Sequence, residues 1–422
     1  MIGRFWTGRK IEKEKEKKMK KFLALILALA MVLAVAACGS EPNEEGDGPV
    51  VDQPPVSQTD EEQPSEQTDN GPVNTNPVKI GVIFYSKDDS LGQLVYSYLN
   101  YAAEVIDNLE VQWVFGSFDT NSQLADAQNL ISAGVDGIMA LTLDDLAIQQ
   151  IASLCNENEV YFQVMFRMPS SEETQAVLDT YDYYVGYAIE DTMDTSYETI
   201  RLLSDMGLSK IGVGGNNHSG TSVLRMSGME KGCEDFNIDV LAQFDIGNDT
   251  SGIQTDVQNI LDSYPDVEAI WSMSGSQGIA EIIVNTLRAH KQSTGKEVGF
   301  ITFDPFDGMA EAFDDGILYG SVGGQAPLCL QAFAALYNAI DGHPLSEEKV
   351  GLLFPFLILT SSEDLNFFET YYNNTEVQIY DENIIKSMLY RYNQSVTLDE
   401  LETLWSSYSM DWIRAELDSR AK

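Results

Sequence analysis

The chain has 422 residues, 25 of them basic and 66 acidic, which gives a formal net charge of −41 at pH 7. A chain this acidic repels phosphate backbones, so we expect no nucleic-acid partner. It contains only three histidines, without the paired spacing of a zinc site, and we expect neither a metal nor a cofactor.

Residues Met19–Cys38 have the organisation of an export signal. Two lysines precede an apolar run that is shorter than the roughly 20 residues a membrane-spanning helix needs. The run ends in Val35-Ala36-Ala37-Cys38, which resembles the lipobox of bacterial lipoproteins and implies that Cys38 becomes the lipidated first residue of the mature protein. An uncleaved anchor is the alternative, and both place the following domain outside the membrane. We expect residues 1–37 to be leader and signal peptide, with translation beginning at Met19.

Residues 39–77 follow the lipidated cysteine and contain seven prolines and ten acidic residues, with almost no aliphatic or aromatic side chains. Such a stretch cannot bury enough apolar surface to offset the entropy lost on ordering. We therefore expect residues 38–77 to be a lipidated, disordered acidic tether.

From Lys79 onward, apolar strands alternate with amphipathic helices, the pattern of βα units on a parallel sheet. The first series of strands is predicted at Ile80–Tyr85, Val111–Phe118, Gly137–Leu141, Tyr161–Phe166 and Tyr183–Ala188. Its helices are predicted at Gln93–Asp107, Ser122–Ala133, Leu146–Asn156 and Ser171–Leu178. The second series has strands at Lys210–Gly214, Val240–Phe244, Ala269–Met273, Val298–Phe303 and Leu318–Val322. Its helices are predicted at Thr195–Met206, Ser222–Phe236, Gly252–Ser263, Gly278–Lys291 and Gly308–Phe313.

Two successive open α/β units predict an α/β fold of two Rossmann-like lobes with parallel sheets, joined by a hinge. We assign residues 78–189 plus about 326–350 to the N-terminal lobe, and about 190–325 plus 351–360 to the C-terminal lobe. Ligands of open α/β sheets bind beyond the carboxyl ends of the strands, so a cleft between the lobes is the expected site.

Residues 361–422 are expected to form a helical C-terminal extension. Thr397 and Glu400 fit a capping box, followed by apolar residues at helical spacing. We expect this apolar face to pack on the parent domain; a docking face for a membrane partner is the alternative.

Three further cysteines, Cys155, Cys233 and Cys329, lie in predicted helices at irregular spacing. Their odd number and the lack of any CxxC motif predict buried free thiols.

Several stretches then carry a family resemblance by their order and spacing. They are Lys79–Ser86 followed by Lys87-Asp88-Asp89, Leu124–Ile138, Gly220–Arg225 with Gly228 and Gly232, Phe300–Asp304, and Gln325–Pro327. Together they resemble type I periplasmic binding proteins of the ribose-binding kind, over about Lys79–Thr360. The resemblance implies a monomer that captures a small polar solute outside the membrane.

The resemblance also implies a set of polar ligand contacts at matching positions. They are Asp88, Asp89, Arg167, Arg225, Ser274, Asp304 and Gln325. Carboxylate and guanidinium groups suit this role because they form charge-assisted hydrogen bonds with ligand hydroxyls. Each has an alternative: an aspartate after a strand often caps a turn or helix, and Arg225 can be a solvated helix residue.

The chain departs from the family's pattern at its stacking aromatics. Leu91, Gly92 and Asn248 stand where the ribose-type proteins place such rings. Three aromatic residues beside the site, Tyr85, Phe166 and Trp271, are candidates to replace them, although aromatic residues in strands are more often part of the core.

No nucleophile elbow, phosphate loop or calcium loop is present, which predicts a binding protein rather than an enzyme. The leading interpretation is a lipid-anchored component of an ATP-binding-cassette (ABC) importer that delivers a sugar-like molecule to its permease. The alternative is a ligand-sensing module that reports to a membrane receptor kinase.

Overall fold

The computed structural model describes residues 77–142, 144–217, 220–247 and 250–420. The predicted signal, Cys38 and the tether lie outside these residues, as does Asn248. Within the described ranges, no helix is both long and apolar enough to cross a membrane.

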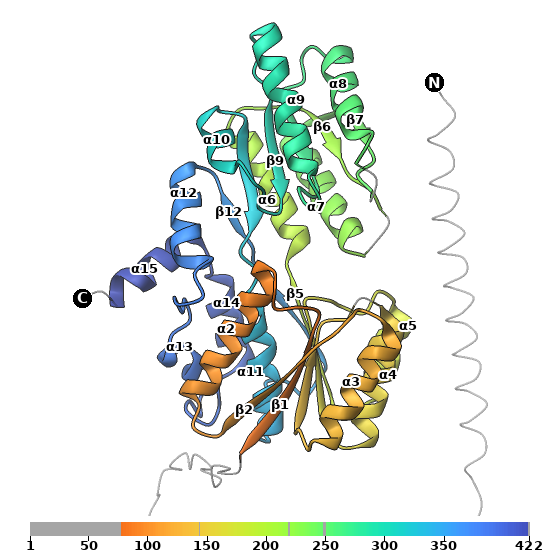
Figure 1. The fold of residues 1–422 in the computed structure, drawn as a ribbon, viewed down its shortest axis with the longest axis vertical. Helices are drawn as coiled ribbons and strands as arrows, with labels where there is room; N and C mark the ends of the chain where they lie inside the picture. Colours follow the sequence, from red (N-terminus) through yellow and green to blue (C-terminus); the bar gives the residue numbers. More distant parts are fainter. Residues whose placement is uncertain (1–76, 143, 218–219, 248–249, 421–422) are drawn as a thin grey trace, which may run out of the picture. The chain divides into compact units, whose positions relative to one another are not determined.

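The first sheet has six strands in the order β11-β5-β4-β3-β1-β2, and every neighbouring pair is parallel. The strands are β1 (Val78–Phe84), β2 (Leu109–Phe115), β3 (Gly137–Ala140), β4 (Tyr161–Met165), β5 (Tyr184–Glu190) and β11 (Val350–Phe354). Its helices are α2 (Ser90–Val105), α3 (Thr120–Ser132), α4 (Asp145–Glu157), α5 (Glu172–Leu178) and α11 (Leu328–Ile340). Figure 1 shows α2 and α11 on one side of this sheet and α3, α4 and α5 on the other.

The second sheet also has six strands, in the order β12-β10-β9-β8-β6-β7. The strands are β6 (Lys210–Gly214), β7 (Asp239–Phe244), β8 (Ala269–Ser272), β9 (Gly299–Phe303), β10 (Leu318–Gly323) and β12 (Leu357–Leu359). Its helices are α6 (Thr192–Asp205), α7 (Gly220–Phe236), α8 (Ile253–Ser263), α9 (Ile279–Thr294) and α10 (Met309–Asp314). One pair departs from the predicted parallel arrangement, because β12 runs antiparallel to β10.

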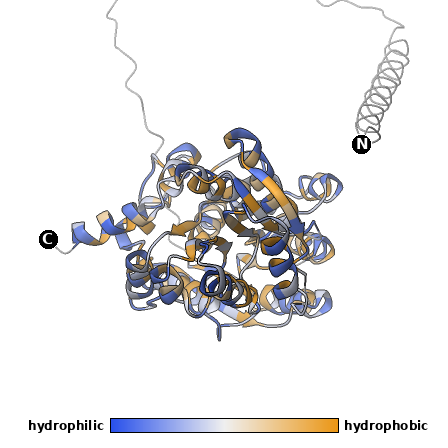
Figure 2. Ribbon diagram, turned by 90° about the horizontal axis from the view of Figure 1, so that it is seen from above, coloured by the Kyte–Doolittle hydropathy of each residue, from blue (hydrophilic) through white to orange (hydrophobic). Residues whose placement is uncertain are grey.

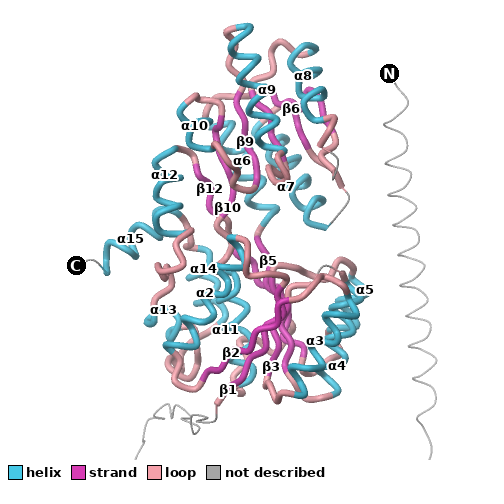
Figure 3. Tube along the Cα trace, viewed as in Figure 1, coloured by secondary structure: helices cyan, strands magenta, loops and turns pink. Residues whose placement is uncertain are grey.

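These two sheets with their helices confirm the predicted α/β architecture of two lobes. Every strand and helix predicted for the two units is present, with its ends within three residues of the prediction. Figure 3 shows the strands as the inner layer of each lobe and the helices outside them, and Figure 2 shows the hydrophilic residues concentrated on the helices.

The chain crosses between the two sheets at residues 190–192, 323–328 and 354–357. The last crossing differs from the predicted lobe boundary at residue 350. β11 pairs with β5 from Val350 to Phe354, so these residues belong to the first lobe. The sequence from 350 to 359 is nearly continuously apolar, and only Pro355 marks the point where one strand ends and the next begins.

The segment around Cys329 was predicted to be helical, but the bounds of helix α11 were not predicted. Every residue from Leu328 to Ala339 is buried, so the helix has no polar face and no amphipathic period. Its outer side is covered by the C-terminal extension: Asn338 Nδ2 donates a hydrogen bond to the Met388 carbonyl at 2.9 Å, and Asn338 Oδ1 accepts one from the Tyr390 amide at 2.8 Å.

The C-terminal extension is helical, as predicted. It contains α12 (Ser362–Phe367), a π-helical turn η1 (Phe368–Tyr372), α13 (Glu382–Ser387), α14 (Leu398–Ser406) and α15 (Met410–Arg420). Thr397 caps α14, because its hydroxyl accepts a hydrogen bond from the Glu400 amide. Leu401 and Trp405 of α14 are buried in the same core as both sheets, which confirms that this face packs on the domain.

All three described cysteines are free and buried, as predicted. Burial raises the pKa of the Cys155 and Cys233 thiols to about 12 and raises that of Cys329 further, so they remain protonated at neutral pH.

Candidate functional site

Five of the seven predicted ligand residues form a polar cluster at the carboxyl ends of the strands. Ser274 and Asp304 are hydrogen-bonded to each other, and Asp89, Arg167 and Arg225 lie near enough to interact electrostatically with groups of the cluster. In the second lobe, Asp304 follows β9 and Ser274 follows β8, so neighbouring parallel strands deliver both side chains to one edge. The Ser274 hydroxyl donates a hydrogen bond to Asp304 Oδ2 at 2.9 Å. This edge is where ligands of open α/β sheets bind.

Arg225 reaches the same edge from α7. Its Nη1 donates a hydrogen bond to the Met273 carbonyl at 2.6 Å, and its guanidinium lies 4.0 Å from the centre of the Phe303 ring. Its Nε donates to the Thr192 hydroxyl at 3.2 Å. These contacts show that Arg225 is a half-buried, fixed side chain, so the alternative of a solvated helix residue is wrong.

Two glycines of α7 allow this placement. A Cβ at Gly228 would lie 2.0 Å from the Met193 carbonyl oxygen of α6, and one at Gly232 would lie 2.8 Å from Ile200. Only glycine permits such a close approach of two helices. The close packing of α6 on α7 thereby brings Thr192 within reach of Arg225.

Backbone strain marks equivalent positions in the two lobes. Phe166 follows β4 with a φ of +60°, and Asp304 follows β9 with a φ of +69°. Both strands are the third in their sheet, counted from β11 and from β12. A non-glycine residue in this region costs on the order of 1 to 3 kcal/mol, and such residues concentrate at functional sites. In the first lobe the strained residue directly precedes the predicted ligand residue Arg167. In the second lobe the strained residue is itself the predicted ligand residue, Asp304.

In the first lobe, Asp89 caps α2: its Oδ1 accepts a hydrogen bond from the Gly92 amide at 2.8 Å, while Oδ2 accepts one from the Tyr85 hydroxyl at 2.5 Å. Asp89 therefore has the structural role considered as the alternative, in addition to any contact with a ligand. Burial and this hydrogen bond raise the pKa of Tyr85, whereas the nearby positive charge of Arg167 lowers it.

Glu190 lies near charged groups of both halves of the cluster and was not predicted from the sequence. It is the last residue of β5, at the first crossing between the lobes, and is half-buried. Burial raises its pKa; the positive charges of Arg167 and Arg225 oppose this, and the negative charge of Asp304 adds to it. Its environment thus contains charged groups from both lobes.

Sequence reasoning missed Glu190 because the predicted strand ended at Ala188, two residues before it. The signal that was available is its position: it stands at the carboxyl end of a strand, immediately before the chain leaves the first lobe. Burial of a carboxylate becomes evident only when β11 is placed beside β5, with Phe354 opposite Glu190.

The other two predicted residues have local contacts in the structure. The Asp88 amide donates to the Ser86 hydroxyl at 3.0 Å, and the Asp88 side chain is exposed. The Gln325 carbonyl accepts a hydrogen bond from the Leu328 amide at 3.0 Å, and Gln325 is half-buried at the second crossing.

Of the aromatic candidates for stacking, two are core residues. Trp271 is fully buried and donates its indole N–H to the Thr199 hydroxyl at 2.9 Å, and Phe166 is only 1% exposed. Tyr85 is half-buried beside the cluster and stacks on Phe118, with ring centres 5.1 Å apart. Position 92 cannot hold an aromatic residue without rearrangement, because a Cβ there would lie 2.1 Å from the Ser86 carbonyl oxygen.

Two surface cavities lie elsewhere. One, of about 670 Å³, is lined by α2 and by Thr375, Glu376 and Gln378 of the extension; the other, of about 550 Å³, is lined by α9 and residues 306–315. None of the seven predicted residues lines either cavity. The candidate site therefore rests on the charged groups at the strand ends and not on either cavity.

Comparison with known proteins agrees with this arrangement. Residues 80–344 match the family model described as a periplasmic binding protein domain. The chain belongs to the periplasmic binding protein family. This family consists of solute-binding proteins, and membership places the protein outside the cytoplasm. No curated protein matches the sequence.

Solved structures show that the binding protein shares the type I fold. A periplasmic ribose ABC transporter protein from Conexibacter woesei is 15% identical with a TM-score of 0.58, covering 71% of this chain and 97% of that chain. An ABC transporter solute binding protein from Bacillus halodurans, with bound myo-inositol, is 17% identical with a TM-score of 0.52, covering 70% and 99%. The fructose binding periplasmic domain of a hybrid two component system is 16% identical with a TM-score of 0.52, covering 69% and 94%. At these identities the likeness concerns the fold.

Proposed function

We propose that the protein is a lipid-anchored, extracytoplasmic solute-binding protein that captures a small sugar-like ligand between its lobes and delivers it to an ABC permease. The observation that carries this proposal is the polar cluster, in which Arg167 and Asp89 come from the first lobe and Arg225, Ser274 and Asp304 from the second. The similar structures with bound myo-inositol and D-arabinose support a polyhydroxyl ligand.

The cluster suits such a ligand for a chemical reason. Vicinal hydroxyls both donate and accept hydrogen bonds, so a site that presents carboxylates and guanidinium groups together can satisfy them on both counts. Asp89 is exposed, but the other four groups are half-buried, so they lose part of their hydration and their hydrogen bonds to a ligand are strengthened. A ligand that touches groups of both lobes stabilises the arrangement in which the lobes are close.

A screen of unfolding temperatures tests this function. The protein is heated with single sugars, polyols, nucleosides and amino acids, because a ligand at about 100 times its dissociation constant adds about 2.7 kcal/mol to stability. We expect at least one sugar or polyol to raise the unfolding temperature by several degrees. Stabilisation by amino acids alone, or by no compound in the panel, would contradict the proposal.

A sensor is the second candidate, and the fructose binding domain of a hybrid two component system is the observation in its favour. The two roles share the binding step and differ in the partner. A permease gene beside the coding sequence supports import, and a histidine-kinase gene there supports sensing.

A further inference from the structure

The C-terminal extension contacts both lobes. On the second lobe, the Ser362 hydroxyl of α12 donates to Asp314 Oδ1 of α10 at 2.5 Å. On the first lobe, the Ser97 hydroxyl of α2 donates to the Thr375 carbonyl at 2.7 Å. Figure 1 shows α12 beside the second lobe and α13 and α14 beside the first. Residues 368–381 therefore make a fourth passage between the lobes, in addition to the three crossings of the sheets.

Helix α15 forms polar contacts with both ends of this fourth passage. Arg414 forms a salt bridge with Asp364 of α12 at 3.0 Å, with 17% of the Asp364 side chain exposed. Arg420 donates to the Gln378 carbonyl at 2.6 Å and to the Ile379 carbonyl. Helix α15 thus ties the two ends of residues 364–379 together, and we call this C-terminal extension the brace. Some of its side chains belong to the core shared by both lobes.

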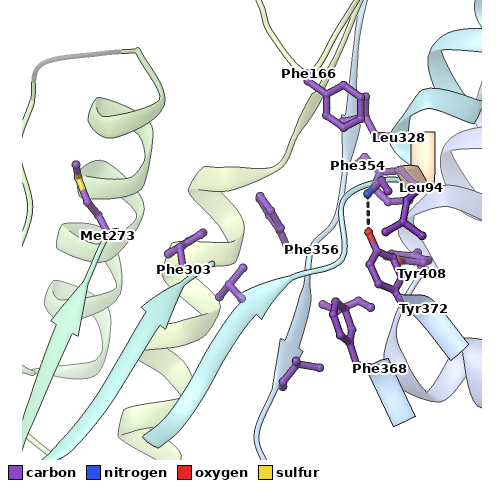
Figure 4. Packing of buried hydrophobic residues seen from close by; sticks show 14 of the residues in the cluster. Leu94, Phe166, Met273, Phe303, Leu328, Phe354, Phe356, Phe368, Tyr372 and Tyr408 are labelled. Carbon is purple, nitrogen blue, oxygen red and sulfur yellow. Dashed lines mark hydrogen bonds between the residues drawn. The ribbon is translucent and has the colours of Figure 1, made fainter. Parts of the chain in front are cut away.

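Two tyrosines of the brace hold the second crossing of the sheets on either side of Gln325. The Ala326 amide donates to the Tyr372 hydroxyl oxygen at 2.8 Å, and the Tyr408 hydroxyl donates to the Gly324 carbonyl at 2.7 Å. Both tyrosines are almost fully buried, at 4% and 2% exposure. Figure 4 shows Tyr372 and Tyr408 side by side, with the hydrogen bond of Tyr372 drawn as a dashed line.

The segment between these two bonds needs an external support. Gly324 has a φ of +86°, so this part of the chain is turned sharply; side chains bond its Gly324 carbonyl and Ala326 amide, and the Gln325 carbonyl accepts from the Leu328 amide. A buried backbone group that loses its partner pays the full cost of desolvation. The two hydroxyls, together with the bond from the Leu328 amide to the Gln325 carbonyl, therefore fix where the backbone of Gln325 lies.

We propose that Tyr372 and Tyr408 are positioning residues for the ligand site: they fix Gln325 at the second crossing, and through them the C-terminal extension controls ligand affinity. The inference rests on the proposed function, because Gln325 is a predicted ligand contact. The extension also opposes relative motion of the lobes, since a hinge with a fourth passage has fewer free conformations than one with three.

The test compares the double variant Tyr372→Phe/Tyr408→Phe with Tyr380→Phe. Tyr380 is 1% exposed in the same extension and its hydroxyl has no protein partner in the described part of the chain, so its variant removes a buried hydroxyl without breaking a bond to the crossing. Amide hydrogen exchange of residues 318–330 is measured without ligand, and affinity is measured for the solute found in the screen. The single variants Tyr372→Phe and Tyr408→Phe replace the double one if it does not fold.

We expect faster exchange at Gly324–Ala326 in the double variant and a loss of affinity of at least about fivefold, the lower end of typical coupling between sites. Tyr380→Phe should match the wild type in both readouts. If amide exchange at the crossing is unchanged in the double variant, the two tyrosines do not hold the crossing. If exchange is faster but affinity is unchanged, the extension holds the crossing without controlling ligand affinity. A wild-type protein that binds no solute contradicts the proposed function instead, and the exchange result still decides whether the tyrosines hold the crossing.

Discussion

At the scale of single residues, some side chains of the site could be predicted from the sequence, and others could be recognised only once the fold was known. Asp304 and Ser274 follow strands, and strand ends are visible in the apolar pattern. Glu190 also ends a strand, but its burial among the charges of Arg167, Arg225 and Asp304 depends on the crossing between the lobes. A carboxylate in such a place costs stability whenever it is ionised.

Glu190→Gln should therefore stabilise the unliganded protein at neutral pH. The folded-state pKa of Glu190 is raised above its unfolded value, so the wild type loses stability as pH rises through the folded pKa and has no such loss below about pH 4. The gain in unfolding temperature of the variant should be greatest near pH 7.5 and should disappear toward pH 4. Glu104→Gln, on the exposed part of α2, controls for the loss of one negative charge.

Thermal unfolding of the three proteins across this pH range is the measurement. A variant that is less stable than the wild type at pH 7.5 would show that the attraction of Glu190 to the two arginines outweighs its burial, and the sign of the argument would be reversed.

At the scale of elements, the apolar period identified strands β1 to β10 and helices α2 to α10 of the two units. Amphipathic helices such as α2 and α9 bury one face and were placed within three residues. α11 has no exposed side, because the extension covers it, and β11 and β12 share one apolar run divided only by Pro355. No bounds were predicted for these three elements, since their burial comes from parts of the chain far away in sequence.

Two variants of Asp89, which caps α2, test whether this residue also contacts the ligand. Asp89→Ala should lower the free energy of unfolding by about 1 kcal/mol, because the Gly92 amide loses its acceptor. Asp89→Asn keeps a good cap and removes only the charge, so it should retain this stability while binding the ligand about tenfold more weakly. Denaturant unfolding and calorimetry separate the two effects. An Asn variant with wild-type affinity would show that Asp89 is a cap alone.

At the scale of the whole molecule, the order of the motifs predicted two lobes and the family, whereas the site needed the structure. The resemblance named seven residues; the structure groups five of them in one cluster, adds Glu190, and shows that Phe166 and Trp271 are core. Side-chain direction at a strand end depends on backbone turns such as the positive φ of Asp304, which no sequence pattern specifies.

Attachment to the membrane is the prediction that concerns the chain before the lobes. If Cys38 is the acylated N-terminus, membrane-extracted protein should yield a peptide that starts at Cys38 and carries a diacyl or triacyl mass. Cys38→Ala should leave the precursor without lipid, and the protein should lose its association with membranes. A mature N-terminus at any other residue, found by mass spectrometry, would refute the lipid anchor.

The central claim is that Arg225 and Asp304 bind one ligand, and calorimetric titration of the solute found in the screen tests it most directly. Asp304 has a positive φ, which alanine would strain, so Asp304→Asn is the informative change; Arg225→Ala removes the guanidinium. Asp307→Asn and Arg201→Ala, at exposed positions of the same lobe, are the controls.

Loss of one partner of a charge-assisted hydrogen bond costs on the order of 2 to 5 kcal/mol, so Arg225→Ala should weaken binding at least about thirtyfold. Asp304→Asn keeps one acceptor and should weaken it at least about tenfold. Without ligand, Asp304→Asn should unfold at nearly the wild-type temperature and Arg225→Ala a few degrees lower, because the Met273 carbonyl loses its donor; the controls should bind within about twofold of the wild type. Wild-type affinity in either site variant, or a loss that follows only from unfolding, would contradict the assignment of the ligand site to the cluster between the lobes.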